Sequence, residues 1–181
     1  MTAHAGILLL CLLGLEGATI LSIRALLLPH FFLGLLVVPP LLLKLASTGH
    51  RFVRYYLGDP AYRAAGPPEL ILRLVAPLVV VSTVALLATG IELWLFGLRF
   101  GEVWITLHKA SFVVWFVVTA IHVLGHVLDT PRLALDDLRQ GGSIGRLLRR
   151  RSVVLASLAA GVVLASGVLV WHTPFVASGG G

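Results

Sequence analysis

The sequence contains few charged residues and a single cysteine. Of its 181 residues, 12% are charged and 58% are hydrophobic, whereas an ordinary soluble domain carries roughly 25% charged residues. A soluble fold of this length cannot cover so much apolar surface, which excludes a sizeable soluble domain. The single Cys11 excludes an internal disulfide, and the sequence has no Cys-x-x-Cys-His motif for covalent attachment of a c-type haem.

Five apolar runs are long enough to cross a membrane as helices. A bilayer core requires about 20 apolar residues in a helix. The runs that meet this length lie at about 6–23, 26–48, 70–97, 103–128 and 152–171. The sequence therefore predicts an all-α, integral membrane bundle of about five transmembrane helices, with residues 1–181 forming a single domain whose solvent is the lipid bilayer.

The net charge of +6 comes from basic residues that lie between the apolar runs. They do not gather on one face, so membrane topology explains them better than nucleic acid, which we do not expect as a partner. With segments 48–69 and 129–151 in the cytoplasm, nine arginines lie inside, and the outer side keeps only Arg24, Arg99 and Lys109. The positive-inside rule then predicts a multi-pass protein of the inner (plasma) membrane with a cytoplasmic amino terminus and an external carboxy terminus.

Histidines within the apolar runs carry the candidate chemistry, because an ionisable residue inside a membrane span is costly and marks function. In the predicted topology His30 and His108 lie near the outer face, at the starts of the runs 26–48 and 103–128. These two runs cross the membrane in the same direction. A haem held edge-on between two helices takes one imidazole from each side of its iron at matching depth. This requirement pairs His30 with His108; the alternative is two buried histidines hydrogen-bonded across helices.

A second haem near the inner face is compatible with the helical spacing. His122 lies fourteen residues after His108, about 21 Å along a helix and on the same face, and His126 follows one turn later. The partner on the other helix is His50, which a straight helix would direct away, so the pairing requires a bend at Pro39-Pro40. Two alternatives stay open: either His122 or His126 binds the iron, and the other contacts a propionate or faces the lipid headgroups.

Other charged residues fit the same interpretation. Arg51 and Arg54 are placed to pair with the propionates of an inner haem. Glu16 and Glu92 are carboxylates within the apolar runs, where they form a proton path or are satisfied by neighbouring hydroxyl groups. We expect the hydroxyl groups.

The histidine arrangement resembles that of small membrane b-type cytochromes, in which histidines on facing helices hold one haem near each membrane surface. The fourteen-residue spacing of His108 and His122 is similar to that found on the helices of di-haem cytochromes b. The stretches Ser47–Tyr56, Gly66–Pro68 and Leu107–His126 also resemble uncharacterised actinobacterial integral membrane proteins. In that pattern the position of His50 is often another aromatic residue, and the sequence departs from it there.

The resemblance implies a haem b protein, with two haems favoured over one, that passes electrons across or within the cell membrane. Its electrons would come from a quinol or a cytoplasmic reductant and go to an external acceptor. The partners implied are quinone, a larger redox complex, or a soluble electron donor or acceptor, and the chain would be an oxidoreductase or the cytochrome b subunit of one. The alternative is a non-redox membrane protein, such as a small transporter or an assembly or anchor subunit, whose histidines bind protons or a metal ion. A haem-bearing anchor subunit without activity of its own is a third reading.

Overall fold

The computed structural model describes residues 2–64, 70–126 and 144–169. These residues form helices and no strand, which confirms the predicted all-α fold. The long helices are α1 (Thr2–Thr19), α2 (Ile23–Tyr56), α4 (Leu70–Phe96), α5 (Val103–His126) and α7 (Ile144–Leu169). A 3-10 turn, η1 (Ile20–Ser22), precedes α2, and a short helix, α3 (Pro60–Arg63), follows it.

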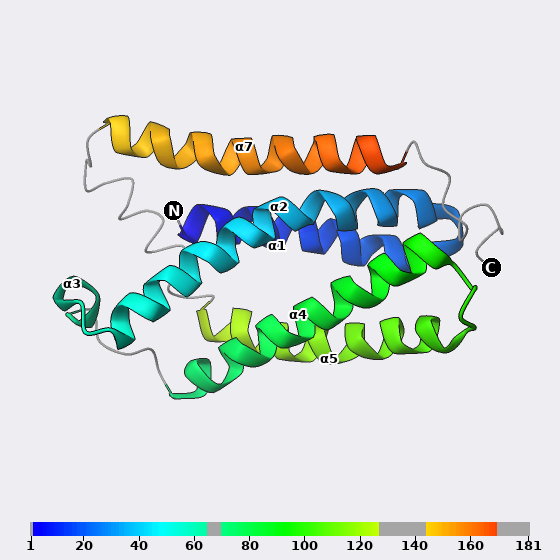
Figure 1. Cartoon of the computed structure of the whole chain (residues 1–181), viewed down its shortest axis with the longest axis horizontal. Helices are drawn as coiled ribbons and strands as arrows, with labels where there is room; N and C mark the ends of the chain where they lie inside the picture. The colour runs from blue at the N-terminus through cyan, green and yellow to red at the C-terminus, as the bar shows by residue number, and fades with distance from the viewer. Residues whose placement is uncertain (1, 65–69, 127–143, 170–181) are drawn as a thin grey trace.

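The long helices have the length and composition of membrane spans. Four apolar stretches of the described chain meet this requirement: Ala5–Tyr56, Arg73–Phe96, Val103–Gly125 and Arg151–Leu169. The first has 52 residues, about 78 Å as a straight helix, which is more than twice the roughly 30 Å of a bilayer core. It is divided at η1, where the chain reverses, so that α1 and α2 lie side by side and antiparallel (Figure 1). The chain is therefore a multi-pass membrane protein.

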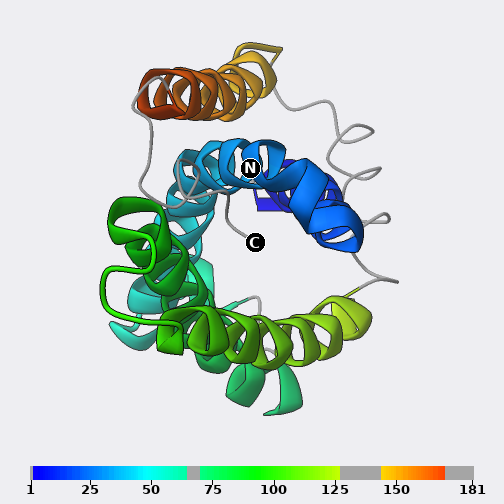
Figure 2. The same cartoon turned by 90° about the vertical axis from the view of Figure 1, so that its right-hand side faces the viewer.

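The helices form two packed groups. In the first, α1 and α7 both pack against α2, and in the second, α4 packs against α5; few contacts join the groups. Figure 2 shows α7 on one side of α1 and α2, and the pair α4 and α5 on the other side. The helices α2 and α5 run in the same direction through the bundle, as the sequence predicted for their two apolar runs (Figure 1). We refer to the two ends of the bundle as the η1 end and the α3 end.

The buried core lies in the first group. It comprises Leu9, Leu12, Leu36, Val37 and Ala165. The side chain of Pro40, about one turn after Leu36 on α2, is also fully buried. Large apolar side chains elsewhere, including many on α4 and α5, are exposed. Exposed apolar side chains on helices whose backbone groups bond within the helix are what a lipid environment requires. The bundle thus presents an apolar surface to the bilayer.

Two helices extend eight residues beyond their predicted runs. α2 continues to Tyr56 instead of ending near residue 48, and α7 begins at Ile144 instead of near residue 152. The predictions followed the length of apolar sequence, which measures membrane thickness, whereas a helix ends where its backbone is capped. Gly58 supplies that stop with φ +88°, and Asp59 then accepts a hydrogen bond from the Ala61 amide at 3.0 Å to cap α3.

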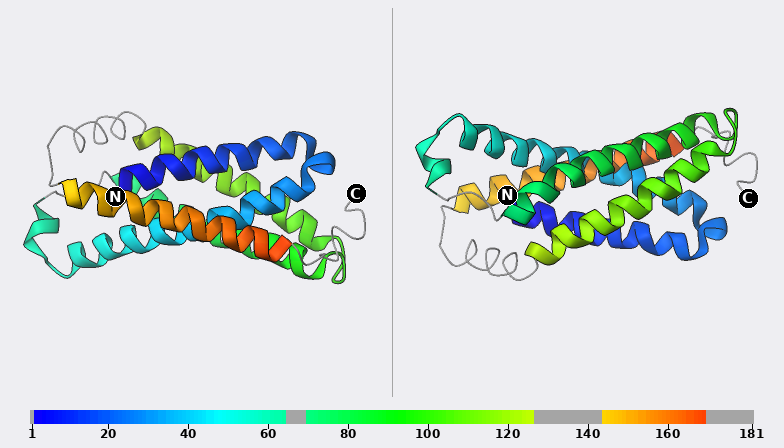
Figure 3. Two further views of the ribbon diagram at one scale, coloured as in Figure 1. Left: turned by 90° about the horizontal axis from the view of Figure 1, so that it is seen from above. Right: turned by 90° about the horizontal axis from the view of Figure 1, so that it is seen from below.

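Helix α2 has a kink before Pro29 and continues through Pro39 and Pro40. Residues Pro39 and Pro40 remain within α2, and the residue with non-helical dihedral angles is Leu26 (φ −110°, ψ 19°), three residues before Pro29. Proline removes a backbone donor and crowds the preceding turn, which tilts a helix. The blue and cyan halves of α2 run in different directions in Figure 1 and in both views of Figure 3.

The contact of α7 with α2 depends on a glycine. A Cβ atom on Gly161 would collide with the backbone carbonyl oxygen of Leu36 and would lie 3.1 Å from its carbonyl carbon. Ala165, one turn further along α7, is completely buried in the same contact. Small residues four apart let two helix backbones approach closely within a membrane, where association depends on van der Waals packing.

We predict that Gly161→Ala weakens the docking of α7. The added methyl group meets backbone and not a movable side chain, so the free energy of unfolding should fall by about 1–3 kcal/mol. Thermal and denaturant unfolding of the protein in detergent measures this. The matched control is Gly167→Ala on the same helix, where a Cβ meets nothing within 4 Å; equal stabilities of the two variants would contradict the prediction.

Candidate functional site

His30 and His108 face each other at the η1 end of the bundle. His30 is in the second turn of α2 and His108 in the second turn of α5, and their ring centres lie 6.3 Å apart with ring planes at 83°. Both residues are half-buried. The structure therefore brings together the two histidines that the sequence paired, and it takes one from each packed group of helices.

A threonine at the end of α1 orients the ring of His30. The Thr19 hydroxyl donates to the Glu16 carbonyl oxygen at 2.5 Å and lies 2.8 Å from His30 Nδ1. Because the hydroxyl hydrogen is used on the carbonyl, the oxygen accepts a hydrogen bond from the Nδ1–H of His30. This places the proton of the neutral ring on Nδ1 and leaves Nε2 as the nitrogen that can bind a metal.

A threonine near the end of α4 orients the ring of His108 in the same way. The Thr89 hydroxyl reaches the backbone carbonyl oxygens of Ala85 at 2.9 Å and Leu86 at 3.0 Å, and it lies 3.0 Å from His108 Nδ1. The imidazole also lies against bare backbone, because a Cβ atom on Gly90 would be 3.1 Å from His108 Cε1. Both histidines thus have Nδ1 bonded to a threonine of the preceding helix.

A glutamate makes the two sides of the site unequal. Glu16 Oε1 lies 3.1 Å from His30 Nδ1, so the ring has two acceptors at one nitrogen. The same oxygen lies against Gly34, where a Cβ atom would be 3.4 Å away. Glu16 Oε2 is buried without a hydrogen-bond partner in the described chain. The partner of Glu16 is therefore an imidazole and not the hydroxyl group that we expected.

A second carboxylate lies on α4, one turn beyond Thr89. Both carboxylate oxygens of Glu92 are buried, and neither has a hydrogen-bond partner among the residues that the structure describes. The expected hydroxyl partner is thus not found for Glu92 either.

A tryptophan fixes how α4 lies on α5. Trp115 is buried, and its Nε1–H donates to the Thr83 hydroxyl at 3.0 Å. Thr83 itself donates to the Val79 carbonyl oxygen at 2.6 Å. This bond and the Thr89–His108 contact set the register of the two helices at two levels, about two turns apart. The position of the His108 ring is therefore determined by the packing of α4 and α5.

The predicted inner residues lie at the α3 end, in several different environments. His50 is exposed, and its ring packs edge-on against Tyr62 at 6.2 Å, whereas His122 is half-buried on α5. His126 ends α5, and its side chain lies outside the described part of the structure. A second haem held by His50 with His122 or His126 stays a prediction.

The two arginines predicted to bind propionates are both exposed. Arg54 Nε forms an ion pair with Asp59 Oδ2 at 3.3 Å, which ties the end of α2 to the cap of α3. The role of Arg51 and Arg54 at an inner haem likewise stays a prediction.

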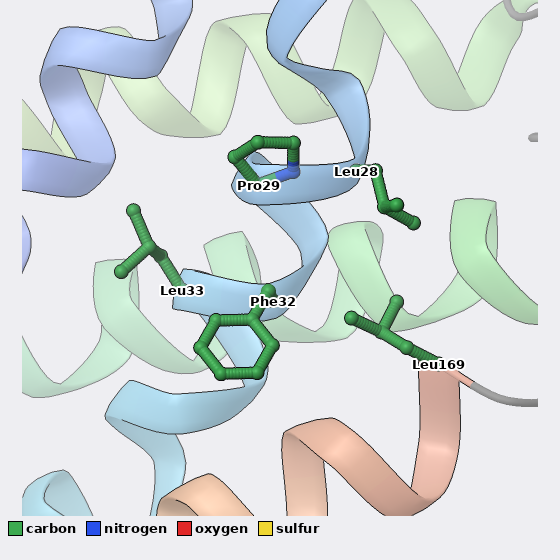
Figure 4. A pocket seen from close by; sticks show the side chains of 5 residues that line it. All are labelled: Leu28, Pro29, Phe32, Leu33 and Leu169. Carbon is green, nitrogen blue, oxygen red and sulfur yellow. The ribbon is translucent and has the colours of Figure 1, made fainter.

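An open apolar groove lies between α2 and the end of α7. Leu28, Pro29, Phe32 and Leu33 line it from α2, and Leu169 lines it from α7 (Figure 4). The groove contains no polar side chain, and it is part of the apolar surface that faces lipid.

The ring separation of His30 and His108 is compatible with a metal held between two imidazoles. Two metal–nitrogen bonds of about 2 Å, with about 1 Å from each nitrogen to its ring centre, separate the centres by about 6 Å. The observed separation of 6.3 Å matches this value. Among the described residues no group of three or more His, Cys, Asp or Glu side chains is arranged to hold a metal ion. Two axial imidazoles suffice when the remaining ligands belong to a haem.

The sequence did not identify Thr19, Thr89 or Gly90 as parts of the site. Thr19 lies within the apolar run 6–23, eleven residues before His30, and Thr89-Gly90 lies within the run 70–97. The available signal was a threonine within an apolar run that precedes a histidine-bearing run.

The chain matches no known protein family, no curated protein sequence and no solved structure.

We predict that Thr89→Val releases the ring of His108. Valine keeps the shape of the side chain but removes the acceptor of Nδ1–H, so the ring should lose its single tautomer, at a cost of about 1–3 kcal/mol in the free energy of unfolding. Nitrogen-15 NMR of histidine-labelled protein reports the tautomer directly. The control is Thr89→Ser, which keeps the hydroxyl; identical histidine spectra for the two variants would contradict the assigned hydrogen bond.

Proposed function

We propose that this chain is a membrane haem b protein that transfers electrons, with His30 and His108 as the two axial ligands of one haem. The observation that carries the proposal is the matched arrangement of the two rings. They lie 6.3 Å apart, and each has its Nδ1 within hydrogen-bond distance of a threonine hydroxyl. A hydrogen bond at Nδ1 that sets tautomer and orientation is the usual support of a histidine bound to a metal.

The two-group architecture supports the same proposal. One ligand comes from α2 in the group α1–α2–α7, and the other comes from α5 in the pair α4–α5, while few contacts join the groups. A planar macrocycle between two helix groups uses ligands from facing helices in this way.

The haem would supply one-electron redox chemistry, and the protein would control its environment. Thr19 and Thr89 orient the rings, Gly90 admits the His108 ring close to the α4 backbone, and the apolar helices exclude water from the site. The electron donor would be a quinol or a cytoplasmic reductant, and the acceptor would be external. The chain would serve as an oxidoreductase or as the cytochrome b subunit of one.

A second haem belongs to the same proposal. His50 would bind it from α2 together with His122 or His126 from α5, and Arg51 and Arg54 would pair with its propionates. All five residues lie at the α3 end of the bundle. The fourteen residues between His108 and His122 correspond to about 21 Å along α5, a separation across which the edges of two haems approach closely enough for electron transfer.

We predict that His30→Ala and His108→Ala each remove one haem equivalent or convert that haem to the high-spin state. Loss of one axial imidazole leaves the iron five-coordinate or unbound. Pyridine haemochrome analysis gives the haem content, and the optical spectrum gives the spin state. Full haem content with unchanged low-spin spectra in both variants would refute the pairing.

Variants at the α3 end serve as controls for this experiment. His50→Ala, His122→Ala and His126→Ala should leave the haem of His30 and His108 in place. If any of these variants contains one haem equivalent less than wild type, that histidine binds the second haem. If all three keep the haem content of wild type, the protein has one haem. A colourless purified wild-type protein would favour the non-redox alternative, in which the histidines bind protons or a metal ion.

The orientation in the plasma membrane follows from charge. We predict that the arginine-rich α3 end is cytoplasmic, so that the amino terminus lies inside and the carboxy terminus outside. Reporter fusions at Gly142 and Ser178 should therefore report opposite sides of the membrane. The same side for both fusions would contradict the five-span topology.

A further inference from the structure

The two proposed haem ligands differ in one respect. His108 has a single side-chain acceptor at Nδ1, the Thr89 hydroxyl at 3.0 Å. His30 has two, the Thr19 hydroxyl at 2.8 Å and Glu16 Oε1 at 3.1 Å. The Thr89 hydroxyl also lies 3.3 Å from the Ser111 hydroxyl, but each ring has one threonine hydroxyl at Nδ1, and among the described residues only His30 has a carboxylate beside it.

Glu16 is held in place by the local fold. It lies in the last turn of α1, where its own carbonyl oxygen accepts the hydrogen bond of Thr19. Its Oε1 faces the backbone of Gly34, one turn after His30 on α2. The side chains of Glu16 and His30 are only 18% and 17% exposed. The carboxylate is therefore confined beside the ring of His30 and has little access to solvent.

The carboxylate is incompletely satisfied by the chain. Its second oxygen, Oε2, is buried and has no hydrogen-bond partner among the described residues. A carboxylate in a membrane span is costly unless a positive group compensates it. A ferric haem iron bound to two neutral imidazoles carries one more positive charge than the ferrous form, so a carboxylate beside one of these imidazoles stabilises the ferric form by its charge.

We propose that Glu16 is a positioning residue that strengthens electron donation from His30 to the haem iron and thereby lowers the midpoint potential of that haem. The inference rests on the proposed function, in which His30 is an axial ligand. A carboxylate that accepts the Nδ1–H of a metal-bound histidine increases the donor strength of the ring and fixes its orientation. Glu16 thus tunes the haem of His30 and His108 from the α1 side, while a threonine hydroxyl lies at Nδ1 of each ring.

Redox titration of the purified haem-loaded protein tests this proposal. The haem of His30 is the component whose optical signal disappears in His30→Ala. In Glu16→Gln, which removes the charge and keeps the shape, the ratio of ferrous to ferric haem at the wild-type midpoint should rise about tenfold, equivalent to about 59 mV for one electron. The matched control is Glu102→Gln, the same change at an exposed carboxylate that directly precedes α5; its ratio should change less than twofold, because water screens an exposed charge.

The outcomes separate this inference from the proposed function. Wild-type protein that binds no haem refutes the function. Haem bound at full content, with Glu16→Gln titrating like wild type, leaves the function standing and overturns the role of Glu16. If Glu16→Gln does not retain the haem, Glu16→Ala replaces it, because alanine also removes the charge. A midpoint for Glu16→Ala equal to that of wild type then overturns the proposal, and a raised midpoint supports it.

Discussion

The hydrogen bond from a threonine hydroxyl to a histidine Nδ1, made once on each side of the site, is the interaction on which the functional account depends. A histidine ring in a membrane span must place one proton and one lone pair, and its surroundings decide where each goes. Thr19 and Thr89 are each clamped to a backbone carbonyl of their own helix, so their oxygens act as acceptors. Both rings then carry the proton on Nδ1 and keep Nε2 for a metal.

The packing of the helices holds each threonine next to its histidine. Each threonine and its histidine lie on consecutive helices of one hairpin, α1–α2 for one pair and α4–α5 for the other. The bond between Trp115 and Thr83 and the backbone contact of His108 at Gly90 fix the second hairpin. The first is held by the buried leucines of α1 and α2 and by the close approach of α7 at Gly161. The two rings meet where the hairpins face each other.

Much of the fold follows from the sequence because hydrocarbon thickness sets the length of an apolar run. The all-α bundle and the parallel directions of α2 and α5 follow from this rule, and so does the meeting of His30 with His108. The helix ends at Tyr56 and Ile144 do not, because α2 continues past its apolar run until Gly58 ends it, and α7 begins before its own apolar run. The acceptors Thr19 and Thr89 were also missed. A threonine in a span looks the same in the sequence whether it contacts a ring, like Thr89, or is buried with no hydrogen-bond partner among the described residues, like Thr119. The register of the helices decides between the two. The prediction of hydroxyl partners for Glu16 and Glu92 was wrong for the same reason, since helix register also decides what each carboxylate contacts.

The most direct test of the central claim is the electron paramagnetic resonance spectrum of the oxidised, purified protein. Two axial imidazoles with ring planes at 83° should give the strongly anisotropic low-spin signal typical of bis-histidine haem with near-perpendicular rings, and both His30→Ala and His108→Ala should lose the contribution of this haem to the low-spin signal. A protein without haem would contradict the account. A low-spin signal that keeps its full wild-type intensity and shape in both variants would show that the haem is bound by other residues.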